Sequence, residues 1–228
     1  MMVDTKKVRA IDIAKLFIKK GLDYPRNTLD GNMKLQKLVY FSQLIHLAKY
    51  GKPLFDDPIY AFKHGSVIEN VRQAYQYNNN WLVNESMKFE EDLIEEEKES
   101  IELTERIFGN LTANELSELN HQQFSWKSSY DRSVDDFFDY HHKEASIIDI
   151  ERIIEHDIEK VQQLLLAFEV SKESKKHFIV INSITFYFEP DQTVLNDEIL
   201  SELEEFTHDC TESIYTFYFD ENLGLVIF

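Results

Sequence analysis

Hydrophobic residues recur every three or four positions through most of the first 170 residues, which is the period of an amphipathic helix. The pattern predicts helices near residues 5–20, 33–50, 67–77 and 90–106. Asp4 or Thr5 is placed to cap the first of these, Gly21 to end it, and Gly51 to help end the second. A turn-rich stretch at 24–32 separates the two helices, so the chain begins as a helical bundle.

Between the second and third helices, residues 58–65 form a short extended piece, and helical periodicity resumes at Ser66. Thr112 and Glu115 have the spacing of a capping box, which predicts a short helix through Leu119. Residues 120–132 show no periodicity. We interpret them as an irregular segment whose aromatic residues, Phe124, Trp126 and Tyr130, close the core or else form a contact hot spot.

A last strong helix is predicted over residues 146–170, and the pattern changes after it. Its inward side is expected to consist of Ile150, Ile153, Ile154, Ile158, Val161, Leu164 and Leu165. Residues 177–191 and 213–228 are β-branched and aromatic runs that flank a helical stretch at 199–206. The sequence therefore predicts a mainly helical domain over residues 1–172 and a small α+β extension of ββαββ type over residues 175–228.

Charged residues are distributed unevenly along the chain, and this distribution narrows the classes of partner that the chain could bind. The chain of 228 residues has a net charge of −18, yet residues 1–76 contain 13 basic and 7 acidic side chains. The remainder is strongly acidic, which disfavours general nucleic-acid binding and would steer a basic protein partner. A DNA-binding autoregulator remains an alternative through the basic N-terminal portion, although no recognition helix is evident.

Candidate catalytic chemistry is sparse. The six glycines are scattered singly, so no phosphate loop, dinucleotide fingerprint or nucleophile elbow is present. His64, Ser66 and the many carboxylates are residue types of a hydrolytic triad, but a chain this acidic contains such a set in any case, so the signal is not specific. His141, His142, Glu144 and His156, or His121 with the first two, could hold a metal only if the fold brought them together, and their spacing matches no known ligand motif.

One cysteine, Cys210, fits a reducing compartment, and no apolar run is long enough to span a bilayer. We therefore expect a cytoplasmic protein without a signal peptide, membrane contact, cofactor or resident metal.

Several segments in order resemble one known family. These are KLQKLVYFSQ (34–43), AKYGKPLFDDPIYAFKHGSV (48–67), NVRQAY (70–75) and the stretch LTANELSELN to FSWKSSY (111–130). Together they resemble the Panacea domain, the family that includes SocA-type antitoxins of bacterial and phage toxin–antitoxin systems, over about residues 8–165. The resemblance implies a compact helical, non-enzymatic protein that neutralises a toxin by direct complex formation.

The resemblance also marks individual positions as structural or partner-binding. They are Lys34, Gln36, Lys37, Tyr40, Gln43, Lys63, His64, Gly65, Trp126 and Tyr130. Two positions depart from the family pattern, which usually has proline where this chain has Ser66 and Ser125. We expect Leu35, Leu38, Val39 and Ile45 to face inward, while the polar residues of the same segment cross-link neighbouring loops or meet a partner.

These observations predict the antitoxin of a two-gene system, whose partner is a cognate and possibly basic protein toxin. One alternative is an adaptor or regulatory interaction protein of a phage or mobile element that has no toxic partner. A metal-dependent hydrolase is a second alternative. The C-terminal extension lies outside the resemblance, and its aromatic strands and acidic helix suggest partner-specific contacts.

Overall fold

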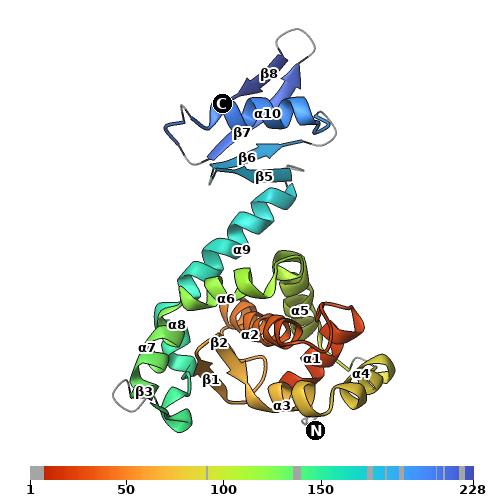
Figure 1. Cartoon of the computed structure of the whole chain (residues 1–228), viewed down its shortest axis with the longest axis vertical. Helices are drawn as coiled ribbons and strands as arrows, with labels where there is room; N and C mark the ends of the chain where they lie inside the picture. Colours follow the sequence, from red (N-terminus) through yellow and green to blue (C-terminus); the bar gives the residue numbers. More distant parts are fainter. Residues whose placement is uncertain are drawn as a thin grey trace. The chain divides into compact units, whose positions relative to one another are not determined.

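The computed structural model describes residues 8–90, 92–135, 140–173, 177–182, 184–189, 193–208, 210–212, 214–220 and 224–228. The chain divides into two compact units, Met1–Leu164 and Leu165–Phe228 (Figure 1). The first unit is mainly helical and the second contains a small sheet, so the expected combination of a helical domain with a small α+β extension is confirmed at this level.

Helix α2 (Leu29–Tyr50) is the central element of the first unit, and other helices surround it (Figure 1). Residues Leu35 to Ile45 of this helix are buried. Its direct neighbours are α1 (Ala10–Lys19), α3 (Glu69–Tyr77), α5 (Glu95–Phe108), α6 (Ala113–His121) and α8 (Ile150–His156). α2 is therefore buried all round, and its polar side chains need partners inside the protein.

Local signals fix where several helices begin and end. The Thr28 hydroxyl accepts a hydrogen bond from the Gly31 amide at the start of α2, and Gly51 ends that helix in the left-handed conformation. At the start of α6, Thr112 and Glu115 form the predicted capping box. The proposed caps of the first helix, Asp4 and Thr5, lie outside the described residues, and α1 begins at Ala10.

The strand prediction for the first unit was incomplete. Strands β1 (Ile59–Phe62) and β2 (Gly65–Ile68) form an antiparallel hairpin around a two-residue turn. Helical periodicity was expected from Ser66, but α3 begins only at Glu69. Residues 65–68 are buried, so the apolar Val67 and Ile68 fit a strand as well as a helix, and periodicity cannot distinguish the two over four residues.

Three helix predictions also need correction. The segment expected to be irregular contains helix α7 (Phe124–Ser133), and α4 (Asn79–Lys88) was not expected at all. The long last helix is two helices, α8 and α9 (Ile158–Glu173), which meet at Asp157. Ile154 and Leu164 are exposed, while Ile153, Ile158, Val161 and Leu165 are buried. Helix α7 escapes detection because its buried side consists of three serines and a single apolar residue, Trp126, which gives no hydrophobic period.

Helix α5 carries the acidic run that begins near residue 90. It starts at Glu95, and it buries Ile101 and Phe108 while Glu95, Glu99 and Glu102 face solvent. The remaining elements of the first unit are a two-residue strand pair and a short 3-10 helix, namely β3 (Val134–Asp135), β4 (Tyr140–His141) and η1 (Lys143–Ser146).

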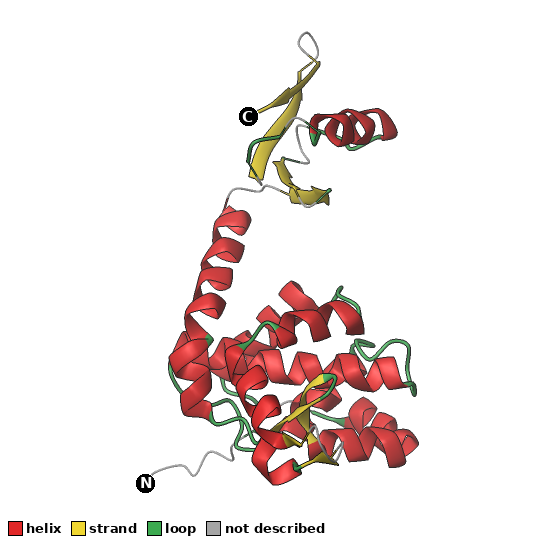
Figure 2. Ribbon diagram, turned by 60° about the vertical axis from the view of Figure 1, so that its left-hand side comes forward, coloured by secondary structure: helices red, strands yellow, loops and turns green. Residues whose placement is uncertain are grey.

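The second unit has the predicted ββαββ order. Its sheet has the strand order β5–β6–β7–β8 and consists of β5 (His177–Ile181), β6 (Ile184–Phe188), β7 (Ile214–Asp220) and β8 (Gly224–Ile227). Pairing is antiparallel except between β6 and β7, which are parallel. Helix α10 (Asp197–Phe206) makes the crossover between them and lies along one face of the sheet (Figure 2). The core between helix and sheet consists of Phe186, Phe188, Ile199, Leu203 and Phe217.

Candidate functional site

Polar side chains of the buried α2 hold the segments that follow it. The Gln43 side chain accepts hydrogen bonds from the amides of Leu54 (2.8 Å) and Phe55 (3.1 Å), and it donates one to the Phe55 carbonyl (3.1 Å). Two helical turns earlier on the same side of α2, Gln36 accepts from the Ile68 amide at 2.8 Å. These bonds satisfy backbone groups in a loop and a strand that would otherwise be buried without partners. The expected cross-links to neighbouring segments are thus present.

Lys37 is the most unusual of these residues, because it is a lysine that is only 1% exposed. Its Nζ donates a hydrogen bond to the Ser66 carbonyl at 3.1 Å. Burial disfavours the charged form and lowers the pKa of the amine to about 7. Lys34 plays a similar part on the neighbouring side, where its Nζ donates to the Gly109 carbonyl at 2.8 Å and burial lowers the pKa of the amine.

The turn of the hairpin brings together three of the predicted positions. Gly65 has φ +98°, and a side chain there would meet the Lys37 ammonium group and the Asn120 carboxamide. Lys63 and His64 on the same turn point their side chains into solvent. The His64 carbonyl accepts from the Ser117 hydroxyl at 3.0 Å, so the backbone of the turn is fixed while its two basic residues remain accessible.

The serines that replace the family's prolines both use their backbone amide. The Ser66 amide donates to Asn120 Oδ1, and Asn120 Nδ2 donates to Ser66 Oγ at 3.0 Å. The Ser125 amide donates to Asp157 Oδ2 at 2.9 Å, beside the Phe124 amide, which donates to Asp157 Oδ1 at 2.8 Å. A proline has no amide hydrogen to donate, so these bonds depend on the departures from the family pattern.

Asn120 and Asp157 were not predicted from the sequence. Asn120 is fully buried where α6 ends, and Asp157 caps α7 from the break between α8 and α9. Neither residue stands out among the many exposed polar residues around it. The only signal was the pair of serines, since an amide that replaces a proline needs an acceptor.

An aromatic stack closes the other side of the hairpin. Trp126 is 8% exposed and donates from Nε1 to the Phe62 carbonyl at 3.1 Å. Its ring lies between those of His121 (centroids 4.2 Å apart) and Tyr130 (5.2 Å). Trp126 therefore contributes to the core, as expected, whereas Phe124 is exposed and contacts the His156 ring. Burial and the nearby Lys37 and His64 lower the pKa of His121.

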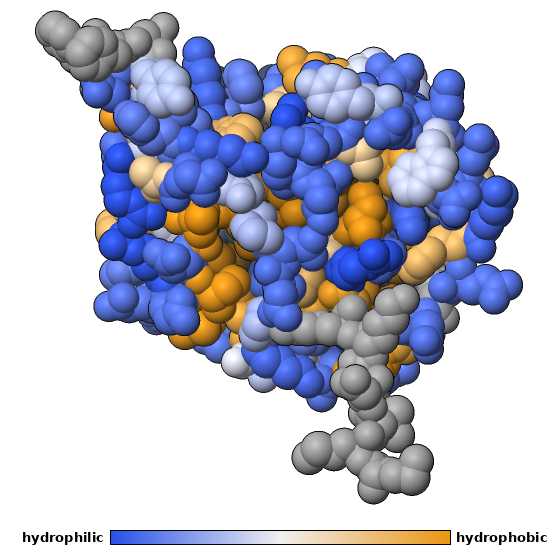
Figure 3. Space-filling model, turned by 90° about the horizontal axis from the view of Figure 1, so that it is seen from below, coloured by the Kyte–Doolittle hydropathy of each residue, from blue (hydrophilic) through white to orange (hydrophobic). Residues whose placement is uncertain are grey.

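A pocket of about 150 Å³ lies between the first half of α2, the hairpin and α3. Its walls are largely apolar, and the charged side chains that reach it are basic. It is lined by Leu29, Asn32, Met33, Gln36, Lys37, Phe62, His64, Val67, Arg72 and Gln76. We call it the α2–hairpin pocket. On the face shown in Figure 3, hydrophobic side chains reach the surface in separate patches between hydrophilic ones.

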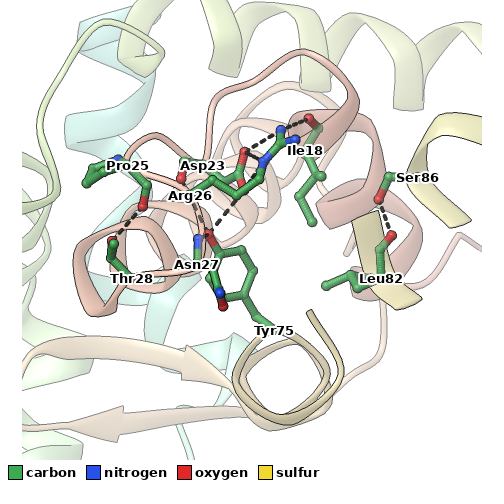
Figure 4. Close-up of polar contacts among 9 residues, drawn as sticks. All are labelled: Ile18, Asp23, Pro25, Arg26, Asn27, Thr28, Tyr75, Leu82 and Ser86. Atoms are coloured by element: carbon green, nitrogen blue, oxygen red, sulfur yellow. Dashed lines mark hydrogen bonds and ion pairs between the residues drawn. The ribbon is translucent and has the colours of Figure 1, made fainter. Parts of the chain in front are cut away.

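The wall of this pocket that α3 contributes is fixed by a polar cluster (Figure 4). The Tyr75 hydroxyl on α3 donates to Asp23 Oδ2 at 3.1 Å and accepts from the Asn27 amide at 2.9 Å. Arg26 forms a bidentate ion pair with Asp23 and also donates to the Ile18 carbonyl at 2.9 Å. Gly31 on α2 leaves room for this loop, since a side chain there would lie 2.7 Å from the Tyr75 oxygen.

Arg72 on the same wall is already paired. Its guanidinium donates to both oxygens of Glu69, at 2.6 and 2.9 Å, and to Gln76 Oε1 at 2.6 Å. The pair with Arg72 lowers the pKa of Glu69 to about 2. The basic groups of the hairpin turn, Lys63 and His64, are more accessible to a partner than Arg72.

The alternative of an enzyme gains no support from these contacts. Ser66 is fully buried and its hydroxyl accepts from Asn120, so it is not exposed to a substrate. His141 Nε2 donates to the Ala61 carbonyl at 3.0 Å, and His156 lies beside Glu155 and Phe124. Within the described ranges, no three His, Cys, Asp or Glu side chains are grouped so that they could hold a metal ion.

A comparison with known protein families finds a match to part of the chain. The model of the family described as "Antitoxin SocA-like, Panacea domain" matches residues 35–127. Residues 35–127 are similar to a Panacea domain. The resemblance recognised in the sequence is thus confirmed for this range, which is narrower than the 8–165 expected. Neither the curated proteins nor the solved structures contain a significant match to the chain.

The Panacea-like range contains most of the network described above. It includes Gln36, Lys37 and Gln43 on α2, the whole hairpin, Asn120 and Trp126. Lys34 and Tyr130 lie just outside it. None of the described helices is both long enough and apolar enough to cross a membrane.

Proposed function

We propose that this chain is an antitoxin that neutralises a protein toxin by forming a direct complex with it. The observation that carries the proposal is the match of residues 35–127 to the SocA-like Panacea domain. The contacts inside this range are consistent with a binding protein, because Gln36, Lys37 and Gln43 of α2 are engaged with backbone groups and the His46–Ser100 pair is buried away from any substrate.

The surface around the hairpin turn is the part of the domain that we propose meets the toxin. It combines the apolar α2–hairpin pocket with the exposed side chains of Lys63 and His64 on a turn whose backbone is fixed. A rigid apolar pocket with a polar rim is the usual arrangement of an interaction hot spot. Because its backbone is held from inside by Lys37 and Asn120, the turn would lose little freedom on binding.

Growth rescue in a heterologous host tests this proposal. The open reading frame next to the gene is expressed from an inducible promoter, with and without this chain. We expect growth arrest by the neighbour, relief by this chain, and co-purification of the two proteins. A neighbour that is not toxic, or toxicity that the chain does not relieve, would contradict the proposal and favour an adaptor or regulatory protein.

A matched pair of charge reversals locates the interface. Lys63→Glu on the hairpin turn should weaken rescue and co-purification, since it introduces a negative charge beside the pocket. Lys88→Glu on α4 is the control, because that side chain is 73% exposed and lies outside the pocket lining. Equal rescue by both variants would leave the antitoxin function intact but would move the toxin-binding surface away from the hairpin.

A further inference from the structure

The sheet of the second unit has two faces of different character. Side chains alternate along each strand, and one set packs against α10 in the core. The other set consists of Phe178, Val180, Thr185, Tyr187, Ile214, Thr216, Tyr218, Val226 and Phe228. We call this set the open sheet face. Helix α10 lies on the opposite side (Figure 2).

The side chains of the open sheet face form continuous rows across the strands. Phe178 is paired with Tyr187, Tyr187 with Thr216, and Thr216 exchanges backbone hydrogen bonds with Phe228. This row therefore crosses β5, β6 and β7 and ends at Phe228, directly after β8, and the Phe178 and Tyr187 rings lie 5.9 Å apart. Val180, Thr185 and Ile214 form a second row, and Tyr218 with Val226 a third.

Four of these residues, Phe178, Val180, Ile214 and Phe228, are exposed although they are apolar, and the other five are half-buried. Phe178 is 58% exposed, Ile214 57% and Phe228 66%. A sheet face of this composition is normally covered by a second layer. Covering it would remove on the order of 600 Å² of surface from water, when aromatic side chains each contribute up to about 200 Å². One side of a standard protein interface buries about 800 Å², so the face is close to a usable interface in size.

The charges of the chain indicate what could cover it. The outer side of α10 carries Glu198, Glu202, Glu204 and Glu205. In the described strands, the charged residue that faces the same way as the open sheet face is Asp220, at the end of β7. A basic partner would gain little there, because charge steering needs opposite charges. A second copy carries the same net charge of −18 and is repelled by every acidic surface, so a face whose one charge in the described strands lies at its edge is where two copies can meet.

We propose that the open sheet face is a homodimer interface, in which the sheets of two copies of this chain pack face to face. Two such sheets pack about 10 Å apart with their strands roughly aligned, and the arrangement is self-complementary about a twofold axis. Aromatic rows from both copies would interdigitate there, and the acidic helices α10 would remain on the two outer sides. The proposal does not depend on the antitoxin function.

Sedimentation velocity of the full chain tests the proposal over a protein concentration of about 1 to 300 μM, a range suited to a modest interface. We expect a monomer–dimer equilibrium that shifts to dimer as concentration rises. Added salt should strengthen it, because salt screens the repulsion between two acidic copies but does not weaken apolar contacts. A chain that stays monomeric at every concentration, or a dimer that dissociates as salt is raised, would overturn the proposal.

Two lysine substitutions locate the interface. Tyr187→Lys places a charge in the middle of the longest row, and Phe228→Lys places one at its exposed end, where the fold is disturbed least. Each should weaken dimerisation at least tenfold, and Phe228→Lys decides the matter if Tyr187→Lys does not fold. Trp81→Lys is the control, since Trp81 is 55% exposed but lies on α4 in the first unit. A dimer that survives Phe228→Lys, or that Trp81→Lys dissociates, would contradict the assignment.

Discussion

The two units of this chain have interiors of different chemical character. The first unit buries a helix with polar side chains on it, and Gln36, Lys37 and Gln43 each bind backbone groups of other segments. The core cluster described for the second unit consists of aromatic and aliphatic residues, and Thr193 is the buried polar residue among the described residues of that unit. Buried polar bonds specify where particular loops lie, whereas apolar packing specifies only which faces meet. The unit that contains the Panacea-like range is therefore the one whose loop geometry is fixed most closely.

The difference has a physical cost and a benefit. An apolar core tolerates changes of shape as long as volume is kept, while a polar network loses much of its stability when one partner is removed. In the first unit that network fixes the hairpin turn on which Lys63 and His64 are exposed. In the second unit the simple alternation of the strands leaves the open sheet face uncovered.

The largest expected loss of stability follows from a substitution in the core of the second unit. Phe186 is fully buried among Phe206, Tyr215 and Phe217, and Phe186→Ala should cost about 3–5 kcal/mol through lost burial and the cavity left behind. Hydrogen exchange should show lost protection in β5–β8 while the amides of α2 remain protected. Phe219→Ala, at a position 47% exposed, is the control and should change little. Loss of protection in α2 as well would show that the two cores are not separate.

The next effect tests the hairpin turn. Gly65→Ala must place a side chain at φ +98° against Lys37 and Asn120, and we expect a loss of about 2–4 kcal/mol in urea unfolding. Gly51→Ala is the matched control, because φ is +65° there but no atom lies within 4 Å of the new methyl group. Its cost should be near 1 kcal/mol. Similar losses for both glycines would mean that the network around Lys37 does not constrain the turn.

A pH-dependent effect tests the burial of Lys37. Its pKa is about 7 in the folded chain, against 10.5 for an ordinary lysine. Between these values the unfolded chain binds a proton that the folded chain does not, so stability rises with pH, by at most about 1.4 kcal/mol per pH unit. We expect the free energy of unfolding of the wild type, minus that of Lys37→Met, to increase by about 1–2 kcal/mol from pH 7 to 8.5.

The control for this titration is Lys88→Met, because the side chain of Lys88 is 73% exposed. Its difference from the wild type should be constant over the same range. Both variants retain the other titrating groups, so those contributions cancel. A flat difference for Lys37→Met would show that the lysine keeps its proton when the chain folds.

The smallest effect concerns a buried polar group outside the network. The Tyr40 hydroxyl is buried near the Ser125 and Ser66 side chains but makes no hydrogen bond of normal geometry with a described residue, and burial raises its pKa. Tyr40→Phe removes a desolvated hydroxyl and no bond, so we expect a change within about 0.5 kcal/mol, or a slight gain. A loss above about 1 kcal/mol in thermal or urea unfolding would place Tyr40 inside the network and extend the polar interior.

The candidate site could be predicted from the sequence only in part. The family positions on α2 were marked by their sequence, and the bonds of Gln36, Lys37 and Gln43 to neighbouring segments match the expectation of cross-links. Asn120 and Asp157 could not be predicted from the sequence, because the backbone amides that they bind lie on segments far away in the chain. The pocket likewise needs three elements that the sequence does not place side by side.

The amino-acid sequence by itself determined the features that depend on neighbours along the chain. These include the capping box at Thr112, the end of α2 at Gly51, and the alternation that produced the strands of the second unit. Only the tertiary structure decided that residues 65–68 form a strand, that α7 is helical and that α8 and α9 part at Asp157. In those segments local preferences are weak, and hydrogen bonds to distant residues such as Asn120 and Asp157 determine the conformation.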